Sequence, residues 1–390
     1  MSTEGQARCL DAFIVALSQA SEGGEKRWYA STLELQLASL EFCGACRSVP
    51  TLHVVVNNGT PRRLWSRGES QIQPSTLSTV PPSGRTPMVR AVHLTWALSL
   101  RVLVHSAANE LWRWSSSLEL LGSASSASLV CVVWPQVIKR LVFGNRFNQR
   151  IVRVVWPASL QQLSFGLMFN QPIAGVEWPA SLQQLSFGFQ FNQPITSVVW
   201  PASLQQLSFV HDFDQPIAGV VWPATLQQLS FGRNFNQPIA GVVWPASLQQ
   251  LSFGHCFNKP IAGVVWPASL QQLSFGGRFN QPTAGVVWPA SMQEPSFGGR
   301  FNQPIARVVW SASLQLLSFG NSFNQPIAGV VWPASLQQLS FGYCFNQPIA
   351  GVVWPSFLQK LSFGHRFSQP ITGIVWPASM SYLTREGIRL

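Results

Sequence analysis

The sequence contains few charged residues. Asp, Glu, Lys and Arg make up only 10% of its 390 residues, whereas they make up about a quarter of an average soluble domain. Lys and Arg outnumber Asp and Glu by 25 to 14, but no run of basic residues resembles a nuclear-import or nucleic-acid-binding patch. With 46% hydrophobic residues, the chain is too apolar to be disordered over most of its length.

Cysteine is also scarce. The six cysteines do not follow the spacing of a disulfide framework. Cys43 and Cys46 form a lone pair, which lacks the second pair of ligands that a tetrahedral zinc site requires. We therefore expect no cofactor, no metal and no dependence on disulfides.

Long hydrophobic runs are absent as well. No apolar segment approaches the ~20 residues of a membrane-spanning helix. The first apolar stretch, Phe13–Leu17, is short and follows Asp11, unlike the hydrophobic region of a secretory signal. We expect a cytoplasmic or otherwise intracellular protein without a membrane span.

The chain does contain a strict internal repeat. A period between 20 and 50 residues is typical of arrays whose units stack on one another and bury a shared core. Here the step is 22 residues, without insertion or deletion, and it is set by tryptophans at positions 134, 156, 178, 200, 222, 244, 266, 288, 310, 332, 354 and 376.

One unit, Trp244–Val265, shows what each repeat specifies. Leu251 and Phe253 flank a polar Ser252, an alternation that predicts a short strand with one buried face. Neighbouring units are nearly identical, so these strands can pair in parallel and in register. Two prolines and two glycines leave no room for a long helix. The unit therefore consists of a strand and extended or 3₁₀ turns.

The remaining apolar positions of the unit predict the core. They are Leu248, Phe257, Ile261, either Val264 or Val265, and the tryptophan. The tryptophan column could instead form a platform on which nucleic-acid bases stack. The valines before it and the proline after it favour burial.

The Asn of each unit is expected to connect neighbouring copies. Asn236, Asn258 and Asn280 stand at equivalent positions. Their side chains can hydrogen-bond backbone groups of adjacent units, which a tight non-helical loop would otherwise leave without partners.

These motifs resemble a known family. Phe-Asn-Gln-Pro-Ile, together with the Trp-Pro-Ala-Ser-Leu-Gln-Gln-Leu-Ser-Phe-Gly segment, resembles the FNIP repeat, a 22-residue relative of the leucine-rich repeats, over about residues 134–383. The resemblance implies a mainly β, leucine-rich-repeat-like curved solenoid with a parallel sheet on one face. Members of that family often carry an F-box that recruits targets for ubiquitin ligases, but residues 1–65 lack its Leu-Pro opening.

Outside the array the sequence is less regular. Residues 1–65 form an N-terminal region that is partly helical or disordered, with a strand expected at Val54–Val56. The composition of residues 66–90 is that of a linker. Residues 91–133 contain faint echoes of the unit and are interpreted as degenerate capping repeats, and residues 384–390 form a tail. Within the array, Pro295 and Ser311 break the consensus and predict a local irregularity between them.

Two positions of each unit vary while the rest are nearly constant. They precede the Phe of the Phe-Asn motif. Variation on a fixed scaffold is typical of a recognition surface, although drift after duplication would also produce it. The candidate partner-binding residues at these positions are Arg146, His211, Asp212, Arg233, Asn234, His255, Arg278, Arg300, Tyr343, His365 and Arg366.

The function that these features favour is a non-enzymatic scaffold, monomeric, that binds protein partners through its sheet face and variable positions. His211, Asp212 and Asp214 form the one dense polar cluster of the array, but a diverged copy explains it better than a catalytic site does. Two alternatives stay open. One is nucleic-acid or polyanion binding, because residues 121–390 carry fourteen Lys and Arg against five Asp and Glu. The other is a substrate adaptor of a ubiquitin ligase.

Overall fold

The computed structural model describes residues 53–56, 88–93, 113–121, 129, 134, 137–385 and 388–389, with side chains at 129, 134 and 137–385. These residues belong to two compact units, Met1–Phe169 and Asn170–Leu390, so the division falls inside the repeat array. The expected helical or disordered segments of residues 1–52 and most of the expected linker lie outside the described residues.

The described residues of the first unit form five strands. β1 pairs with β2 antiparallel, and the later neighbours pair in parallel, with Leu118 of β3 opposite Leu141 of β4. The predicted strand at Val54–Val56 is confirmed by β1. The strands are β1 (His53–Val56), β2 (Met88–His93), β3 (Arg113–Leu121), β4 (Arg140–Phe143) and β5 (Gln162–Ser164).

The second unit contains the remaining strands, one per coil until the last coil. The final pair, β15 and β16, is antiparallel and includes part of the expected tail. The strands are β6 (Gln184–Phe187), β7 (Gln206–Phe209), β8 (Gln228–Ser230), β9 (Gln250–Ser252), β10 (Gln272–Ser274), β11 (Glu294–Ser296), β12 (Leu316–Ser318), β13 (Gln338–Ser340), β14 (Lys360–Phe363), β15 (Tyr382–Arg385) and β16 (Ile388–Arg389).

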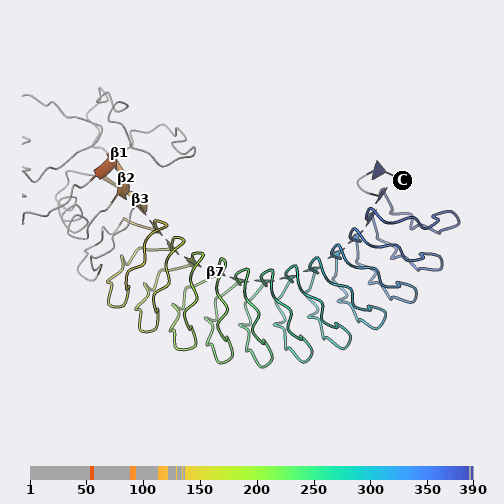
Figure 1. Cartoon of the computed structure of the whole chain (residues 1–390), viewed down its shortest axis with the longest axis horizontal. Helices are drawn as coiled ribbons and strands as arrows, with labels where there is room; N and C mark the ends of the chain where they lie inside the picture. Colours follow the sequence, from red (N-terminus) through yellow and green to blue (C-terminus); the bar gives the residue numbers. More distant parts are fainter. Residues whose placement is uncertain are drawn as a thin grey trace, which may run out of the picture. The chain divides into compact units, whose positions relative to one another are not determined.

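Pairing in this unit follows the repeat. Leu251 of β9 lies opposite Leu273 of β10, 22 residues later, and the other parallel pairs keep this register. The strands line the inner, concave side of the curved unit, and the rest of each coil fans outward (Figure 1). No α-helix occurs among the described residues. The predicted curved solenoid of 22-residue coils is therefore confirmed.

Stacked aromatic side chains fill the core. Phe253 and Phe257 lie with ring centroids 4.2 Å apart, and Phe257 stacks on its equivalent, Phe279, at 6.0 Å. Trp244 is only 7% exposed and stacks on Trp266 at 6.3 Å. Burial is thus confirmed for all of the column except Trp178 and Trp376, which are half-buried, and the buried rings are closed to nucleic-acid bases.

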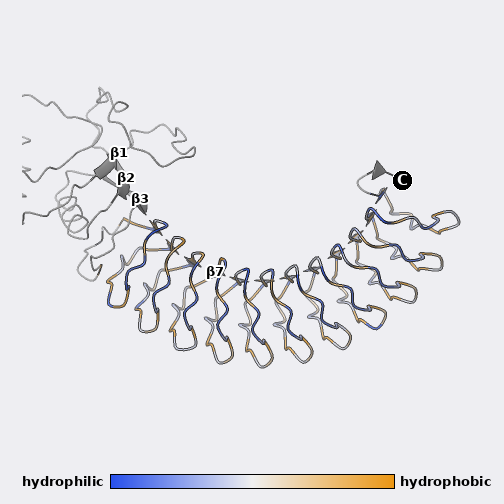
Figure 2. Ribbon diagram, in the orientation of Figure 1, coloured by the Kyte–Doolittle hydropathy of each residue, from blue (hydrophilic) through white to orange (hydrophobic). Residues whose placement is uncertain are grey.

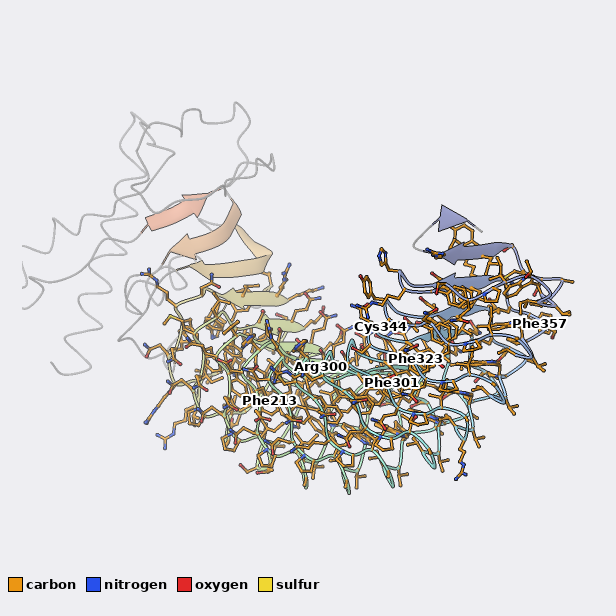
Figure 3. All side chains as sticks on the ribbon, turned by 45° about the vertical axis from the view of Figure 1, so that its right-hand side comes forward. Phe213, Arg300, Phe301, Phe323, Cys344 and Phe357 are labelled. Atoms are coloured by element: carbon orange, nitrogen blue, oxygen red, sulfur yellow. The ribbon has the colours of Figure 1, made fainter. Side chains whose placement is uncertain are left out.

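Exposure separates the aromatic residues into two kinds. Phe301 and Phe323 are completely buried inside the coils, whereas Phe357, outside the repeat pattern, is 61% exposed at the surface (Figure 3). Apolar and polar segments alternate within every coil (Figure 2). Each coil therefore contributes one layer to a continuous core while presenting polar groups to water.

Asparagine side chains connect neighbouring coils as predicted. The Oδ1 atom of Asn236 accepts a hydrogen bond from the backbone N–H of Asn258 at 2.9 Å, and the Oδ1 atom of Asn258 accepts one from Asn280 at the same distance. Gln281 adds a bond from its Nε2 atom to Asn258 Oδ1 at 3.0 Å. These bonds satisfy polar groups on a segment that has no strand partner.

Glycines permit two close or unusual backbone conformations. Gly263 has a φ of 74° in the turn closed by the hydrogen bond from Val264 N–H to Ile261 O, a conformation that glycine adopts without steric cost. Gly254 follows the strand, and a Cβ atom there would overlap the carbonyl oxygen of Gly232 in the preceding coil. The spacing between coils at this point depends on the missing side chain.

The copy containing Pro295 is locally irregular. β10 and β11 pair over three residues, but β11 and β12 share only the pair Ser296–Ser318. The N–H of the Phe that ends each strand donates to the next coil. N–H groups two residues apart on a strand point in the same direction, so a residue at position 295 would also donate to β12. Proline has no N–H, and this donor is therefore missing. The adjacent bond, Phe297 N–H to Ser318 O, is 3.2 Å long, against 2.9 Å for Phe275 to Ser296.

The second consensus break has no such effect on the backbone. Where Ser311 replaces proline, the turn keeps its hydrogen bond from Leu314 N–H to Ser311 O, at 3.2 Å. The predicted irregularity is thus confined to the β11–β12 pairing.

The structure also decides between the two adjacent valines of the unit. Val264 is buried, with 6% exposure, whereas Val265 is 81% exposed. After the exposed Ala262 and Gly263, the side chains from Val264 to Trp266 point in, out and in without joining a sheet. An exposed valine therefore recurs in successive coils, at positions 199, 221, 243, 265, 287, 309, 331, 353 and 375.

Candidate functional site

The variable residues lie in the turn that follows each strand, at the edge of the concave sheet face. We call this edge the rim. Its backbone is held by bonds between coils: Cys256 N–H donates to Arg233 O at 2.8 Å, and Arg278 N–H donates to His255 O at 2.8 Å. The same bond recurs in later coils, for example from Arg300 to Gly277 at 2.9 Å. Different side chains therefore project from the same backbone geometry.

The structure brings three of the predicted residues together in one cluster. His211 Nδ1 lies 2.6 Å from Asp212 Oδ1, and Asn234 Nδ2 donates to the same carboxylate oxygen at 3.1 Å. The imidazole of His211 also stacks on Phe189, with centroids 3.7 Å apart and planes 12° from parallel. We call Phe189, His211, Asp212 and Asn234 the acidic rim cluster.

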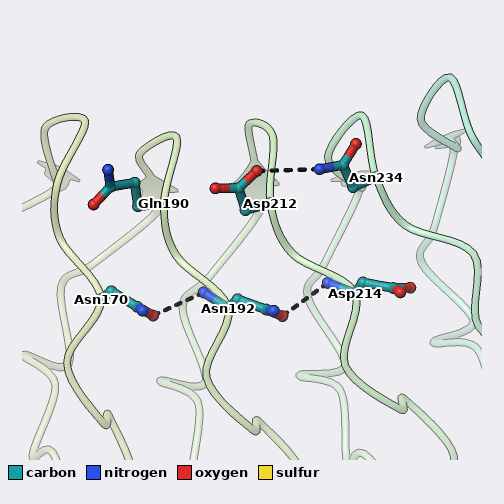
Figure 4. Close-up of a pocket in the computed structure, with 6 residues that line it drawn as sticks. All are labelled: Asn170, Gln190, Asn192, Asp212, Asp214 and Asn234. Atoms are coloured by element: carbon teal, nitrogen blue, oxygen red, sulfur yellow. Dashed lines mark hydrogen bonds between the residues drawn. The ribbon is translucent and has the colours of Figure 1, made fainter.

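An open cavity of about 520 Å³ lies beside this cluster. Figure 4 shows two rows of side chains around it, one on the rim and one on the asparagine column. In the second row, Asn192 N–H donates to Asn170 Oδ1, and Asp214 N–H donates to Asn192 Oδ1, each at 3.0 Å. The lining residues are Asn170, Gln190, Asn192, Asp212, Asp214 and Asn234.

The chemistry of the cavity is that of polar recognition. Two carboxylates and four amides supply acceptors and donors, which suits a hydrogen-bonding or cationic group of a partner. In the asparagine column, the carboxylate of Asp214 takes the role of the Asn side chain, because its Oδ1 atom accepts a hydrogen bond from the backbone N–H of Asn236 at 2.8 Å. No group of three or more His, Cys, Asp or Glu in the described part of the chain could hold a metal ion.

A second cluster lies on the rim of later coils. Tyr343 and His365 stack with centroids 5.1 Å apart and planes 6° from parallel. The guanidinium carbon of Arg366 lies 5.5 Å from the centroid of the Tyr343 ring, within the range of a cation–π interaction. We call these three residues the aromatic rim cluster.

The other predicted rim residues are less closely grouped. Arg278 and Arg300 are exposed at the same position of consecutive coils, and Arg233 is exposed beside Asn234. His255 lies over Gly277, where a Cβ atom would overlap its imidazole. Arg146 is exposed on the rim of the first unit.

Four residues around the acidic cluster, Phe189, Gln190, Asn170 and Asn192, were not among the predicted ones. Phe189 occupies the position of His211 one coil earlier, so comparison of equivalent positions would have predicted the stack. Gln190 likewise precedes Asp212. Asn170 and Asn192 belong to the asparagine column, and Asp214, which replaces Asn in the next coil and was noted in the sequence, was the available signal.

The sheet face itself is polar and nearly neutral. Ser208 Oγ donates to Ser186 Oγ at 3.0 Å, so serines of neighbouring strands bond along the sheet. Gln272 Nε2 donates to Glu294 Oε2 at 3.0 Å. In the described residues no helix has the length and hydropathy needed to cross a bilayer.

A solved structure shares this architecture. The chain is similar, with 44% identity and a TM-score of 0.65, to the protein described as "CroV588 a novel circular LRR protein structure". The similarity covers 70% of this chain and 42% of that protein, so the chain spans less than half of its length.

A weaker match is to a leucine-rich repeat protein from Bacteroides ovatus ATCC 8483. It has 10% identity and a TM-score of 0.17 over 80% of this chain and 91% of the other, which is too low to inform the fold. No curated protein matches the chain.

The family model described as FNIP Repeat matches five segments, residues 132–167, 169–212, 213–256, 301–344 and 345–384. Together they make up more than half of the chain. The unmatched interval 257–300 contains Thr283 and Pro295, which depart from the consensus, yet its coils keep the same fold. The matched segments, the 22-residue coils and the stacked Phe-Asn turns show that the chain belongs to the FNIP repeat family.

Proposed function

We propose that this protein is a non-enzymatic scaffold that binds a protein partner through its concave sheet face and its rim. The observation that carries the proposal is the constant backbone of the rim. Because hydrogen bonds between coils fix each rim turn, a substitution there changes the presented chemistry without changing the scaffold.

The two rim clusters supply the chemistry of recognition. The acidic rim cluster offers a carboxylate, an amide and a flat aromatic pair, which suits a basic side chain of a partner. The aromatic rim cluster offers Tyr343 and Arg366, two residue types that are enriched among binding hot spots. Tyr343 is 45% exposed, so its ring is available to a partner while stacked on His365.

The sheet face between these clusters suits a neutral polar contact. Its serine and glutamine side chains are partly exposed and hydrogen-bonded to one another. Such a surface contributes hydrogen bonds and shape, whereas the rim provides charge and aromatic anchors.

Affinity capture with two matched variants tests this proposal. In the rim variant, Phe189, His211, Asp212, Tyr343, His365 and Arg366 are all replaced by Ser. In the control variant, Pro238, Pro260 and Pro282, which are exposed on the Asn-Gln-Pro segment, are replaced by Ser. Partners that bind the wild type and the control but not the rim variant support the proposal, and partners retained by the rim variant contradict it.

One observation favours polyanion binding as a second candidate. Arg278 and Arg300 project from the same position of consecutive coils, so two guanidinium groups are adjacent on the rim. The ligase-adaptor alternative concerns residues 1–65, of which only β1 is described.

A further inference from the structure

One side of each coil in the second unit is almost entirely uncharged. It is the segment between the Ala-Gly turn and the next strand, and we call it the valine flank. In the reference coil its exposed residues are Ala262, Gly263, Val265 and Ala268. The opposite side carries the polar Asn-Gln-Pro segment. The valine flank thus differs in kind from the rim that serves the proposed function.

The valines of this flank are almost fully exposed, and they recur in consecutive coils. Val199 is 82% exposed, Val243 and Val309 are each 81% exposed, and the intervening copies have values of 80% or 81%. At this exposure each valine presents on the order of 100 Å² of apolar surface. Six of them, from Val199 to Val309, present about 600 Å², which already equals the largest apolar patch of an ordinary monomer.

Only two charged residues interrupt the valine flank between residues 170 and 385. Glu177 replaces the exposed valine of its coil, and Arg307 replaces the turn glycine of another coil. Neither forms an ion pair within the described part of the chain. Arg307 is not among the residues with positive φ, although its turn keeps the bond from Val308 N–H to Ile305 O at 3.1 Å.

The positions of these two charges are related by symmetry. Glu177 lies three coils before the coil of Val243, and Arg307 lies three coils after it. A two-fold axis through Val243, along a radius of the arc in Figure 1, reverses the order of coils in a second copy. Glu177 of each copy then faces the coil of Arg307 in the other.

We propose that the valine flank is a self-association surface, on which two copies pack antiparallel with Val243 at the two-fold axis and Glu177 opposite Arg307. A second copy fits for three reasons. It has the same 22-residue spacing, so the coils of the two copies stay opposite one another over seven coils, and the five valines from Val199 to Val287 face valines. Rotation about a radial axis superimposes the two arcs, so their curvature matches. Two symmetry-related ion pairs fix the register.

The buried area agrees with a stable dimer. A standard interface buries about 800 Å² per partner. The six valines supply about 600 Å² of this, and the exposed alanines and the Glu177–Arg307 contacts surround them. From the sequence we expected a monomer; either Val264 or Val265 was assigned to the core, and the exposed column was not recognised.

Sedimentation velocity of the full chain over a range of concentrations tests the proposal. The wild type is expected to sediment as a species of twice 43.0 kDa. Glu177→Arg and Arg307→Glu should each raise the dissociation constant about tenfold or more, since each places like charges opposite one another twice per dimer. The double variant Glu177→Arg/Arg307→Glu should return it to within about threefold of wild type.

Two further variants separate this surface from others. Val243→Asp places two carboxylates at the axis and should weaken the dimer about a hundredfold or more. Lys259→Glu makes the same charge change as Arg307→Glu but on the Asn-Gln-Pro side, and should leave the dimer intact. Circular dichroism should show all five variants folded, because every substituted side chain is at least partly exposed.

Three outcomes would overturn the proposal. In the first, the wild type stays monomeric at all concentrations. In the second, Val243→Asp leaves the dimer intact. In the third, the double variant does not recover the dimer affinity that the single charge reversals lose. None of these outcomes bears on partner binding at the rim, so the two proposals fail independently.

Discussion

Thr283 occupies a position that isoleucine holds in the neighbouring coils. Its side chain is completely buried, as are Ile261 and Ile305 before and after it, and its hydroxyl has no hydrogen-bond partner. A buried hydroxyl without a partner costs about 1–3 kcal/mol. Thr283→Val keeps the shape and removes that cost, so we expect the free energy of unfolding to rise by about 1–2 kcal/mol. Thr283→Ile adds a methylene and a further ~0.8 kcal/mol.

Because each coil contacts only its neighbours, the effect should be local. Native-state hydrogen exchange of the Val286 amide, which donates to Thr283 O at 3.3 Å, is the suitable measurement, and it should slow about fivefold to thirtyfold. Urea unfolding gives the global value.

Thr225→Val is the matched control, and it should have the opposite sign. Thr225 Oγ1 donates to Ala202 O at 2.6 Å and is also 2.9 Å from Leu204 O, so its removal should cost about 0.5–1.5 kcal/mol. If Thr283→Val changes neither the exchange rate nor the urea midpoint, the hydroxyl is not unsatisfied and the reasoning is wrong.

Three other predictions concern the ladders and the rim. Pro295→Leu restores a strand donor and should stabilise the β11–β12 pairing by about 1 kcal/mol, seen as slower exchange of the Phe297 amide. Asn258→Ala should destabilise the array by about 1–2 kcal/mol because it removes two hydrogen bonds. Asn258→Asp should cost less, because Asp214 accepts the equivalent bonds in its own coil. Urea unfolding of the two variants measures the difference. Arg278→Ser/Arg300→Ser should abolish any heparin binding that falls steeply with salt, measured by titration at two ionic strengths; unchanged binding would exclude the rim as the polyanion site.

Much of this fold follows from the repeat alone. A fixed 22-residue period forces equivalent residues to stack, so the parallel register, the buried tryptophans and the asparagine ladder could be predicted before any coordinates. The alternation of Leu251–Phe253 predicted a strand one residue later than the observed β9, Gln250–Ser252. The β11–β12 irregularity followed from Pro295, since proline has no N–H to donate.

The valine flank could not be assigned from residue type, because Val264 and Val265 are chemically identical. Alternation settles the choice only after one neighbour is fixed. Once Trp266 is known to be buried, Val265 must face outward and Val264 inward. The same argument could have been made from the sequence.

The rim clusters show a different limit. Equivalent positions of consecutive coils are adjacent in a stack of fixed period, so the contacts Phe189–His211 and Tyr343–His365 could have been predicted from the sequence. Their ring stacking depends on side-chain rotamers, which the repeat does not specify. The cavity beside Asp212 depends in turn on how six polar side chains are oriented by their mutual hydrogen bonds.

Contacts between neighbouring rim positions also bear on whether their variation is drift. If each position changed freely, the residue in one coil would place no demand on the next. Gly277 and His255 place such a demand on each other, because the imidazole of His255 would have to move to make room for a Cβ atom at Gly277. The His211 imidazole is likewise held between Phe189 and Asp212. Side chains at neighbouring rim positions therefore interact between coils, and under the proposed function a partner would meet these small groups of side chains and not single positions.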